Sequence, residues 1–197
     1  MDISAHEEGF SKMQEVKRRF FALRNGIISD TLRRAGSPFK VIFGLNLPQL
    51  KEIADFTGKD RELAEALRAN DTTRESLLLA PLIYPGNELT EKAARRWLAD
   101  CPTEEVSDML CHGLLRHCSF APEVAFGLLE KKDATDMEVY GAFRLIMNLL
   151  QRLPAEKCRA AVNAADGRTP AIQRLKSQIF DELDFLEGTP QNCPPAN

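Results

Sequence analysis

The stretch TDMEVYGAFRLIMNLL, residues 135–150, decides the fold class of this chain. Its apolar residues recur at helical spacing and do not alternate as they would in a half-buried strand. Thr135 and Glu138 have the spacing of a capping box, in which each side chain accepts a hydrogen bond from the backbone N–H of the other residue. We therefore predict a buried helix that begins here and runs through Val139–Leu150.

The same helical period extends outward from this stretch over nearly the whole chain. Helices are expected to begin at Pro48, at Thr103 and, through a second capping box with Glu75, at Thr72. The best strand candidate, residues 39–43, is short and flanked by proline and glycine. Roughly ten helices joined by short loops make sequential neighbours antiparallel. We expect an all-α fold, a curved stack of antiparallel helical hairpins in a HEAT-like or armadillo-type α-solenoid, with a compact irregular helical domain as the alternative.

Composition places the chain among ordinary globular proteins. It has 197 residues, of which 44% are hydrophobic and 28% charged, so we expect one domain over residues 1–187 and a disordered tail over 188–197. The first ten residues lack the apolar core of a signal peptide, and the longest apolar run, Leu77–Tyr84, is too short to cross a bilayer. The five cysteines are odd in number and follow no framework spacing. These features predict a cytoplasmic protein with reduced thiols and no membrane partner.

The net charge of −3 argues against a dedicated DNA-binding domain, since such domains are usually basic. A local basic face can nevertheless coexist with an acidic total. Basic clusters occur at Lys17–Arg19, Arg33–Arg34, Arg95–Arg96 and Lys131–Lys132. They are either solvated surface or, if several share one concave face, a track for phosphates.

Three segments together resemble the AlkD-type DNA alkylation repair glycosylases: residues 44–54 (GLNLPQLKEIA), 63–80 and 89–111. The resemblance spans roughly residues 40–150. It implies a curved stack of HEAT-like hairpins that holds double-stranded DNA along a concave basic surface. It also implies hydrolysis of the N-glycosidic bond of cationic N3- or N7-alkylated purines, with no cofactor and no metal.

Asp108 stands at the position of the family's catalytic aspartate. The resemblance implies that its carboxylate stabilises the positive charge that builds on the deoxyribose and orients water. Tyr140 aligns with the family's phosphate-holding arginine, and Arg144 follows one helical turn later on the same face. Arg144 is therefore either a phosphate contact or the ion-pair partner of Asp108 or of another acidic residue. If Asp108 has no catalytic role, it is an ordinary surface residue.

Two aromatic groups expected from the resemblance are missing. Glu104 stands where an aromatic should precede Asp108, and Trp97 reads as core packing. Phe180 and Phe185 in the last helix both fit a core stripe. The losses leave two hypotheses open: a glycosylase with reduced or lost activity, or a non-catalytic HEAT-like module that binds DNA or protein.

The pairs Cys111–His112 and His117–Cys118 do not have the spacing of a zinc site, because the two cysteines lie two helical turns apart. We expect buried cysteines, histidines on a polar face, no metal and a monomer.

Overall fold

The computed structural model describes the backbone of residues 3–188 and the side chains of residues 11–188. Helices account for all the regular secondary structure within this part of the chain. They are α1 (Ile3–Ala22), α2 (Gly26–Arg34), α3 (Leu47–Thr57), α4 (Arg61–Ala69), α5 (Arg74–Ile83), α6 (Glu91–Ala99), α7 (Glu104–Gly113), α8 (Ala121–Leu129), α9 (Asp136–Leu149), α10 (Ala155–Ala164) and α11 (Pro170–Gly188), with three short 3-10 turns between them.

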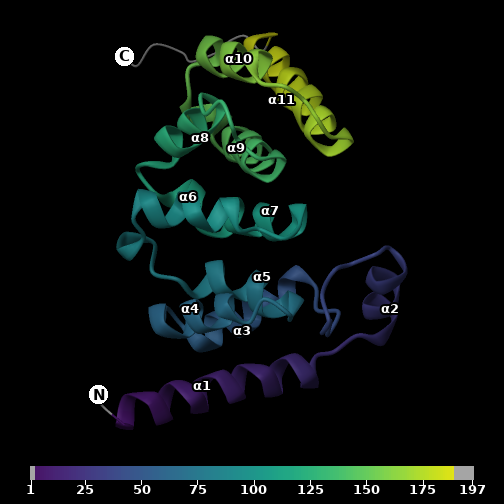
Figure 1. Ribbon diagram of the computed structural model, residues 1–197, viewed down its shortest axis with the longest axis vertical. Coiled ribbons are helices and arrows are strands. Elements are labelled where there is room, and N and C mark those ends of the chain that lie inside the picture. Colours follow the sequence, from purple (N-terminus) through teal and green to yellow (C-terminus); the bar gives the residue numbers. More distant parts are fainter. Residues whose placement is uncertain (1–2, 189–197) are drawn as a thin grey trace, which may run out of the picture. The chain divides into compact units, whose positions relative to one another are not determined.

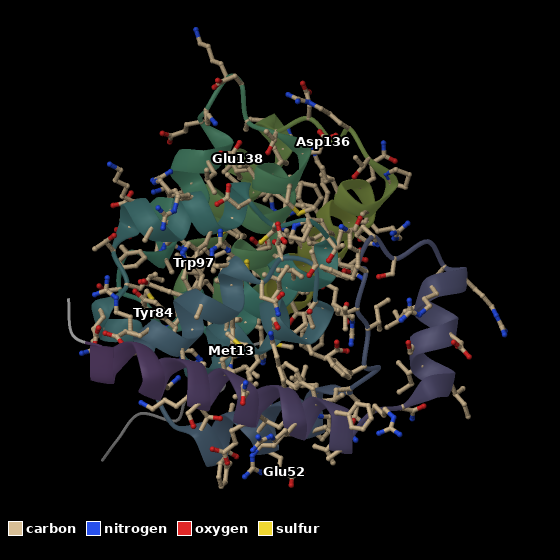
Figure 2. The ribbon with its side chains drawn as sticks, turned by 60° about the horizontal axis from the view of Figure 1, so that its bottom comes forward. Met13, Glu52, Tyr84, Trp97, Asp136 and Glu138 are labelled. Atoms are coloured by element: carbon tan, nitrogen blue, oxygen red, sulfur yellow. The ribbon has the colours of Figure 1, made fainter. Side chains whose placement is uncertain are left out.

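The described chain divides into two compact units, one up to Thr90 and one from Glu91 onward. In the first unit, α1 packs against α3 and α4, and α5 packs against the same two helices. Helix α1 lies along the edge of this unit, and α2 stands to one side of α3–α5 (Figures 1 and 2). One domain over residues 1–187 stays a prediction, and residues 189–197 of the expected tail lie outside the described residues.

Residues 39–43 form no strand. Val41 makes one isolated parallel bridge with Thr73, through hydrogen bonds from its N–H to Thr72 O and from the N–H of Arg74 to its own carbonyl. A ladder cannot continue from this bridge, because the next backbone N–H groups in the loop donate to the Glu75 carboxylate.

The capping box predicted between Thr72 and Glu75 at the start of α5 does not form. The N-cap is Thr73, without a side-chain cap bond, and the Glu75 side chain points into the unit, where it is fully buried. Its carboxylate accepts from the N–H groups of residues 43, 44 and 45 and from Arg74 Nη1 at 2.8 Å. The predicted capping box is therefore wrong, because a distant loop offers this carboxylate more donors than the helix end does.

Gly44 allows this loop to approach α2. Its φ of 78° lies in the left-handed region, and a Cβ at this position would lie 2.3 Å from Asn25 O and 2.8 Å from Ser29 N. Asn25 is the N-cap of α2 and accepts from Ile27 N and Ile28 N. The loop therefore fixes the start of α2 by direct backbone contact.

The second unit stacks three helix pairs in chain order (Figure 1). The first helices of the pairs pack on one another, α6 on α8 and α8 on α10, and the second helices do the same, α7 on α9 and α9 on α11. This pattern is the repeat packing predicted from the sequence. No described helix is long and apolar enough to cross a membrane.

Helix α9 lies at the centre of the second unit. The capping box predicted at its start is confirmed, with Thr135 accepting from Glu138 N and Glu138 accepting from Thr135 N at 2.8 Å. Glu138 is also bonded by Lys131 Nζ. Figure 2 marks Glu138 at this helix start and Trp97 of α6 among the side chains inside the unit, where it is buried as predicted.

Candidate functional site on helices α7 and α9

Asp108 is positioned by the start of α7. Thr103 is the N-cap, and its hydroxyl accepts from Val106 N at 3.3 Å, as its sequence position predicted. Glu104 and Glu105 occupy the first turn, where the helix dipole favours negative charge. Asp108 follows one turn later and is partly exposed.

Gly141 lets α9 approach both α6, at Leu98, and this part of α7, at Ser107, closely. A Cβ on Gly141 would lie 2.7 Å from Leu98 Cδ2 and 3.2 Å from Ser107 Oγ, which is too close for any larger residue without a shift. Cys111 Sγ donates to the Gly141 carbonyl across the same contact at 3.5 Å. Because Ser107 precedes Asp108 and Gly141 follows Tyr140, this close approach brings Asp108 opposite Tyr140.

The structure brings Asp108, Tyr140 and Arg144 together in one hydrogen-bonded cluster. Arg144 donates from Nε to Asp108 Oδ1 and from Nη2 to Oδ2, the latter at 3.2 Å. The Tyr140 hydroxyl donates to Oδ1 at 2.9 Å and accepts from Arg144 Nη2 at 3.1 Å. Both carboxylate oxygens are therefore engaged, and the pairing of Arg144 with Asp108 that the sequence left open is the arrangement found.

Burial and neighbouring charge set the protonation of Tyr140 and Arg144. Burial raises the pKa of Tyr140 to about 12, so the phenol stays neutral and donates its proton toward Asp108. Burial alone would lower the pKa of Arg144, but the Tyr140 hydrogen bond and the Asp108 charge outweigh it and raise that pKa. Arg144 is therefore a cation at every physiological pH, and its charge offsets that of the carboxylate.

The remaining groups expected from the resemblance do not gather around Asp108. Glu104 is exposed on the first turn of α7, and Trp97 is core. Phe180 is half-buried, with the Arg159 guanidinium 5.7 Å from its ring centroid. The prediction that Phe185 is core is wrong, because it lies two residues beyond buried Leu183, off the stripe, and is 67% exposed.

The cysteine and histidine pairs give no sign of a metal site. No group of three or more potential ligands occurs in the described part of the chain. Cys111 is fully buried, and burial raises the pKa of its thiol. His112 and His117 are exposed and both lie within reach of Arg116.

The four basic clusters fall in both units and are partly neutralised. Arg19 pairs with Glu15, Arg95 with Glu91, and Lys131 with Glu138. The two arginines at residues 33 and 34 are exposed at the end of α2.

The structure thus brings together Asp108, Tyr140 and Arg144, whose functional roles stay predictions, and two further residues that the sequence did not single out lie at the same contact. Gly141 and Ser107 control how closely α7 and α9 approach. A glycine within an otherwise apolar helix was the available signal, because it marks a close approach.

A solved structure with a similar fold was found by comparison. It is described as "a new family of proteins related to the HEAT-like repeat DNA glycosylases with affinity for branched DNA structures". It superposes with a TM-score of 0.69 at 15% sequence identity, over 93% of this chain and 88% of that one. The likeness confirms the predicted fold class, an all-α solenoid of HEAT-like repeats. No protein-family profile matches the sequence, and no curated protein matches it.

Proposed function

We propose that this chain is a DNA-binding HEAT-like repeat protein, related to the AlkD-type glycosylases, that does not hydrolyse N-glycosidic bonds. The DNA-binding half rests on the fold shared with proteins that have affinity for branched DNA, together with the resemblance of residues 40–150 to the AlkD-type family. The proposed absence of hydrolysis rests on the hydrogen bonds that Tyr140 and Arg144 donate to the Asp108 carboxylate.

The bidentate pairing of Asp108 with Arg144 is the observation that supports the absence of hydrolysis. A carboxylate stabilises a developing sugar cation only if its charge faces that cation and is not already neutralised. Here Arg144 and Tyr140 engage both oxygens. Losing one preorganised electrostatic group lowers the rate of catalysis by roughly 10²- to 10³-fold. In addition, Glu104 stands at the position of the expected aromatic, and its negative charge repels phosphate.

The pairing also removes Arg144 from the set of free phosphate contacts. Its guanidinium would have to break the Asp108 bonds before it could bind a phosphate in the same geometry. DNA binding must therefore depend on basic residues elsewhere in the chain.

Two assays on the same protein separate the halves of this proposal. Fluorescence anisotropy with a four-way junction and a linear duplex, at several salt concentrations, should show binding that weakens as salt rises. Release of 7-methylguanine and 3-methyladenine from alkylated DNA should not exceed the background rate.

Asp108→Asn and Asp133→Asn form a matched pair, because each removes one negative charge and Asp133 is exposed and distant in sequence from the cluster. Base release should be at background for the wild type and both variants. Release by the wild type that Asp108→Asn alone abolishes would restore the glycosylase hypothesis. Absence of salt-dependent binding to either DNA would refute the DNA-binding half and favour a protein partner.

A further inference from the structure

Positive charge is concentrated in one short part of the chain. Residues 11–40 contain eight lysines and arginines and two acidic residues, a net charge of +6 in a chain whose total is −3. The remaining residues therefore sum to −9. Such asymmetry is typical of a segment that meets a polyanion.

The side of α1 that faces α3 and α4 uses its charges internally. Lys12 Nζ bonds Asp60 at 3.1 Å, and Arg19 bonds Glu15 at 3.4 Å and stacks on the Phe56 ring at 3.2 Å from the centroid. These cations already have partners within the first unit.

The opposite side of α1 is different. Gln14, Lys17, Arg18 and Phe21 line a shallow depression that is wide open to solvent. Lys17 and Arg18 are exposed and pair with no carboxylate among the side chains that the structure describes. Helix α1 lies at the edge of the first unit, and α3 and α4 cover only its other side (Figure 1).

Phe21 adds an exposed aromatic ring to this charged face. It is 58% exposed. The Arg24 guanidinium lies 3.9 Å from its ring centroid and is held there by a 2.8 Å hydrogen bond from Nη1 to Phe21 O. One face of the ring is thus covered by a cation, and the rest of the ring is open to a planar partner.

We infer that this outer face of α1, made of Gln14, Lys17, Arg18 and Phe21, together with Arg24 just beyond the end of the helix, is the surface that binds DNA at a branch point. Lys17, Arg18 and Arg24 contact phosphates, and Phe21 packs on a base left unstacked at the branch. Base faces are covered inside a continuous duplex but accessible where strands separate, so cations next to an open ring fit a branch better than a linear duplex. The inference rests on the proposed DNA binding and names the surface that performs it.

The charged part is tested with Lys17→Gln/Arg18→Gln against Lys92→Gln/Arg96→Gln, an exposed pair on α6. Each lost phosphate contact lowers the slope of log K against log salt by about 0.9. We expect the α1 variant to lose about 1.8 of this slope on a four-way junction, and the α6 variant to keep the wild-type slope. An unchanged slope in the α1 variant, or an equal loss in the α6 variant, would overturn the assignment.

The aromatic part is tested with Phe21→Ala against Phe56→Ala. Phe56 is a close match, since it is 59% exposed and also stacked by an arginine, but it lies on the other side of α1. We expect Phe21→Ala to weaken junction binding about tenfold, equivalent to ~1.4 kcal/mol, with linear-duplex binding unchanged and Phe56→Ala neutral. Equal losses on both DNAs or in both variants would contradict the role of Phe21, whereas a wild type that binds no DNA would instead refute the proposed function.

Discussion

Replacing Glu75 by Gln should destabilise the protein more than any other single neutralisation of a carboxylate described above. The Glu75 side chain is 0% exposed, and its two oxygens accept from Phe43 N, Gly44 N, Leu45 N and Arg74 Nη1 at 2.8–3.4 Å. Glutamine has nearly the same shape but offers one acceptor oxygen and places an NH₂ group against donors.

The size of the effect follows from these contacts. Each hydrogen bond to a charged group contributes about 1.5–3 kcal/mol, and at least one backbone donor loses its acceptor. Arg74, whose side chain is 7% exposed, also loses its counter-charge. Breaking a buried pair from one side costs about 3–5 kcal/mol, so we expect that loss in the free energy of unfolding. For a chain of this size it corresponds to a fall of about 6–20 °C in Tm.

Differential scanning calorimetry and urea titration of the Glu75→Gln variant measure this loss directly. Glu62→Gln is the control, because Glu62 is exposed in the first turn of α4 and should change stability by less than about 0.5 kcal/mol. A Glu75→Gln variant within about 1 kcal/mol of the wild type would show that the carboxylate does not hold the 43–45 loop as described.

Three further predictions concern the second unit. Burial alone would raise the pKa of Glu138, but its hydrogen bonds with Thr135 and Lys131 outweigh burial and lower it. The ionised Glu138 therefore stabilises the fold fully above the usual glutamate pKa, and this stabilisation is lost as the pH falls through the lowered value. Urea titrations from neutral to acid pH should show a steeper loss of unfolding free energy for the wild type than for Glu138→Gln. Gly141→Ala should cost about 1–3 kcal/mol in urea titration, since its Cβ would meet Leu98 Cδ2 of α6 at 2.7 Å and Ser107 Oγ of α7 at 3.2 Å. A neutral result would contradict the close approach of α9 to these two helices. Alkylation followed by peptide mass spectrometry should modify half-exposed Cys118 before buried Cys111, whose thiol pKa burial raises further; the reverse order would contradict the burial of Cys111.

The sequence predicted correctly the helix caps that depend only on residues close together in the chain. The capping box of Thr135 and Glu138 and the cap at Thr103 are both present, because each needs only residues within one helical turn. The box expected at Thr72 failed for the opposite reason. Glu75 has the right spacing, but its partners lie some 30 residues away in a loop whose position only the folded chain determines.

In the candidate site, too, the sequence predicted the features set by nearby residues but not those set by the packing of distant helices. Helical spacing placed Tyr140 and Arg144 on one face, and the resemblance singled out Asp108, yet neither could decide between a phosphate and Asp108 as the partner of Arg144. That choice depends on how closely α7 and α9 approach, and Gly141 sets that distance. Phe185 was misplaced because its register on α11 is shifted from the stripe that ends at Leu183.

The Asp108–Arg144–Tyr140 cluster has a consequence for anyone who would engineer catalysis into this scaffold. Its side chains keep 40% exposure for Asp108 and 26% for Arg144, so the pair contributes only modestly to stability, about 0–1 kcal/mol. Freeing the carboxylate by Arg144→Gln would therefore cost the fold little. The ion pair therefore neutralises the Asp108 carboxylate while contributing little to stability, so a substitution at Arg144 can free this charge without unfolding the protein.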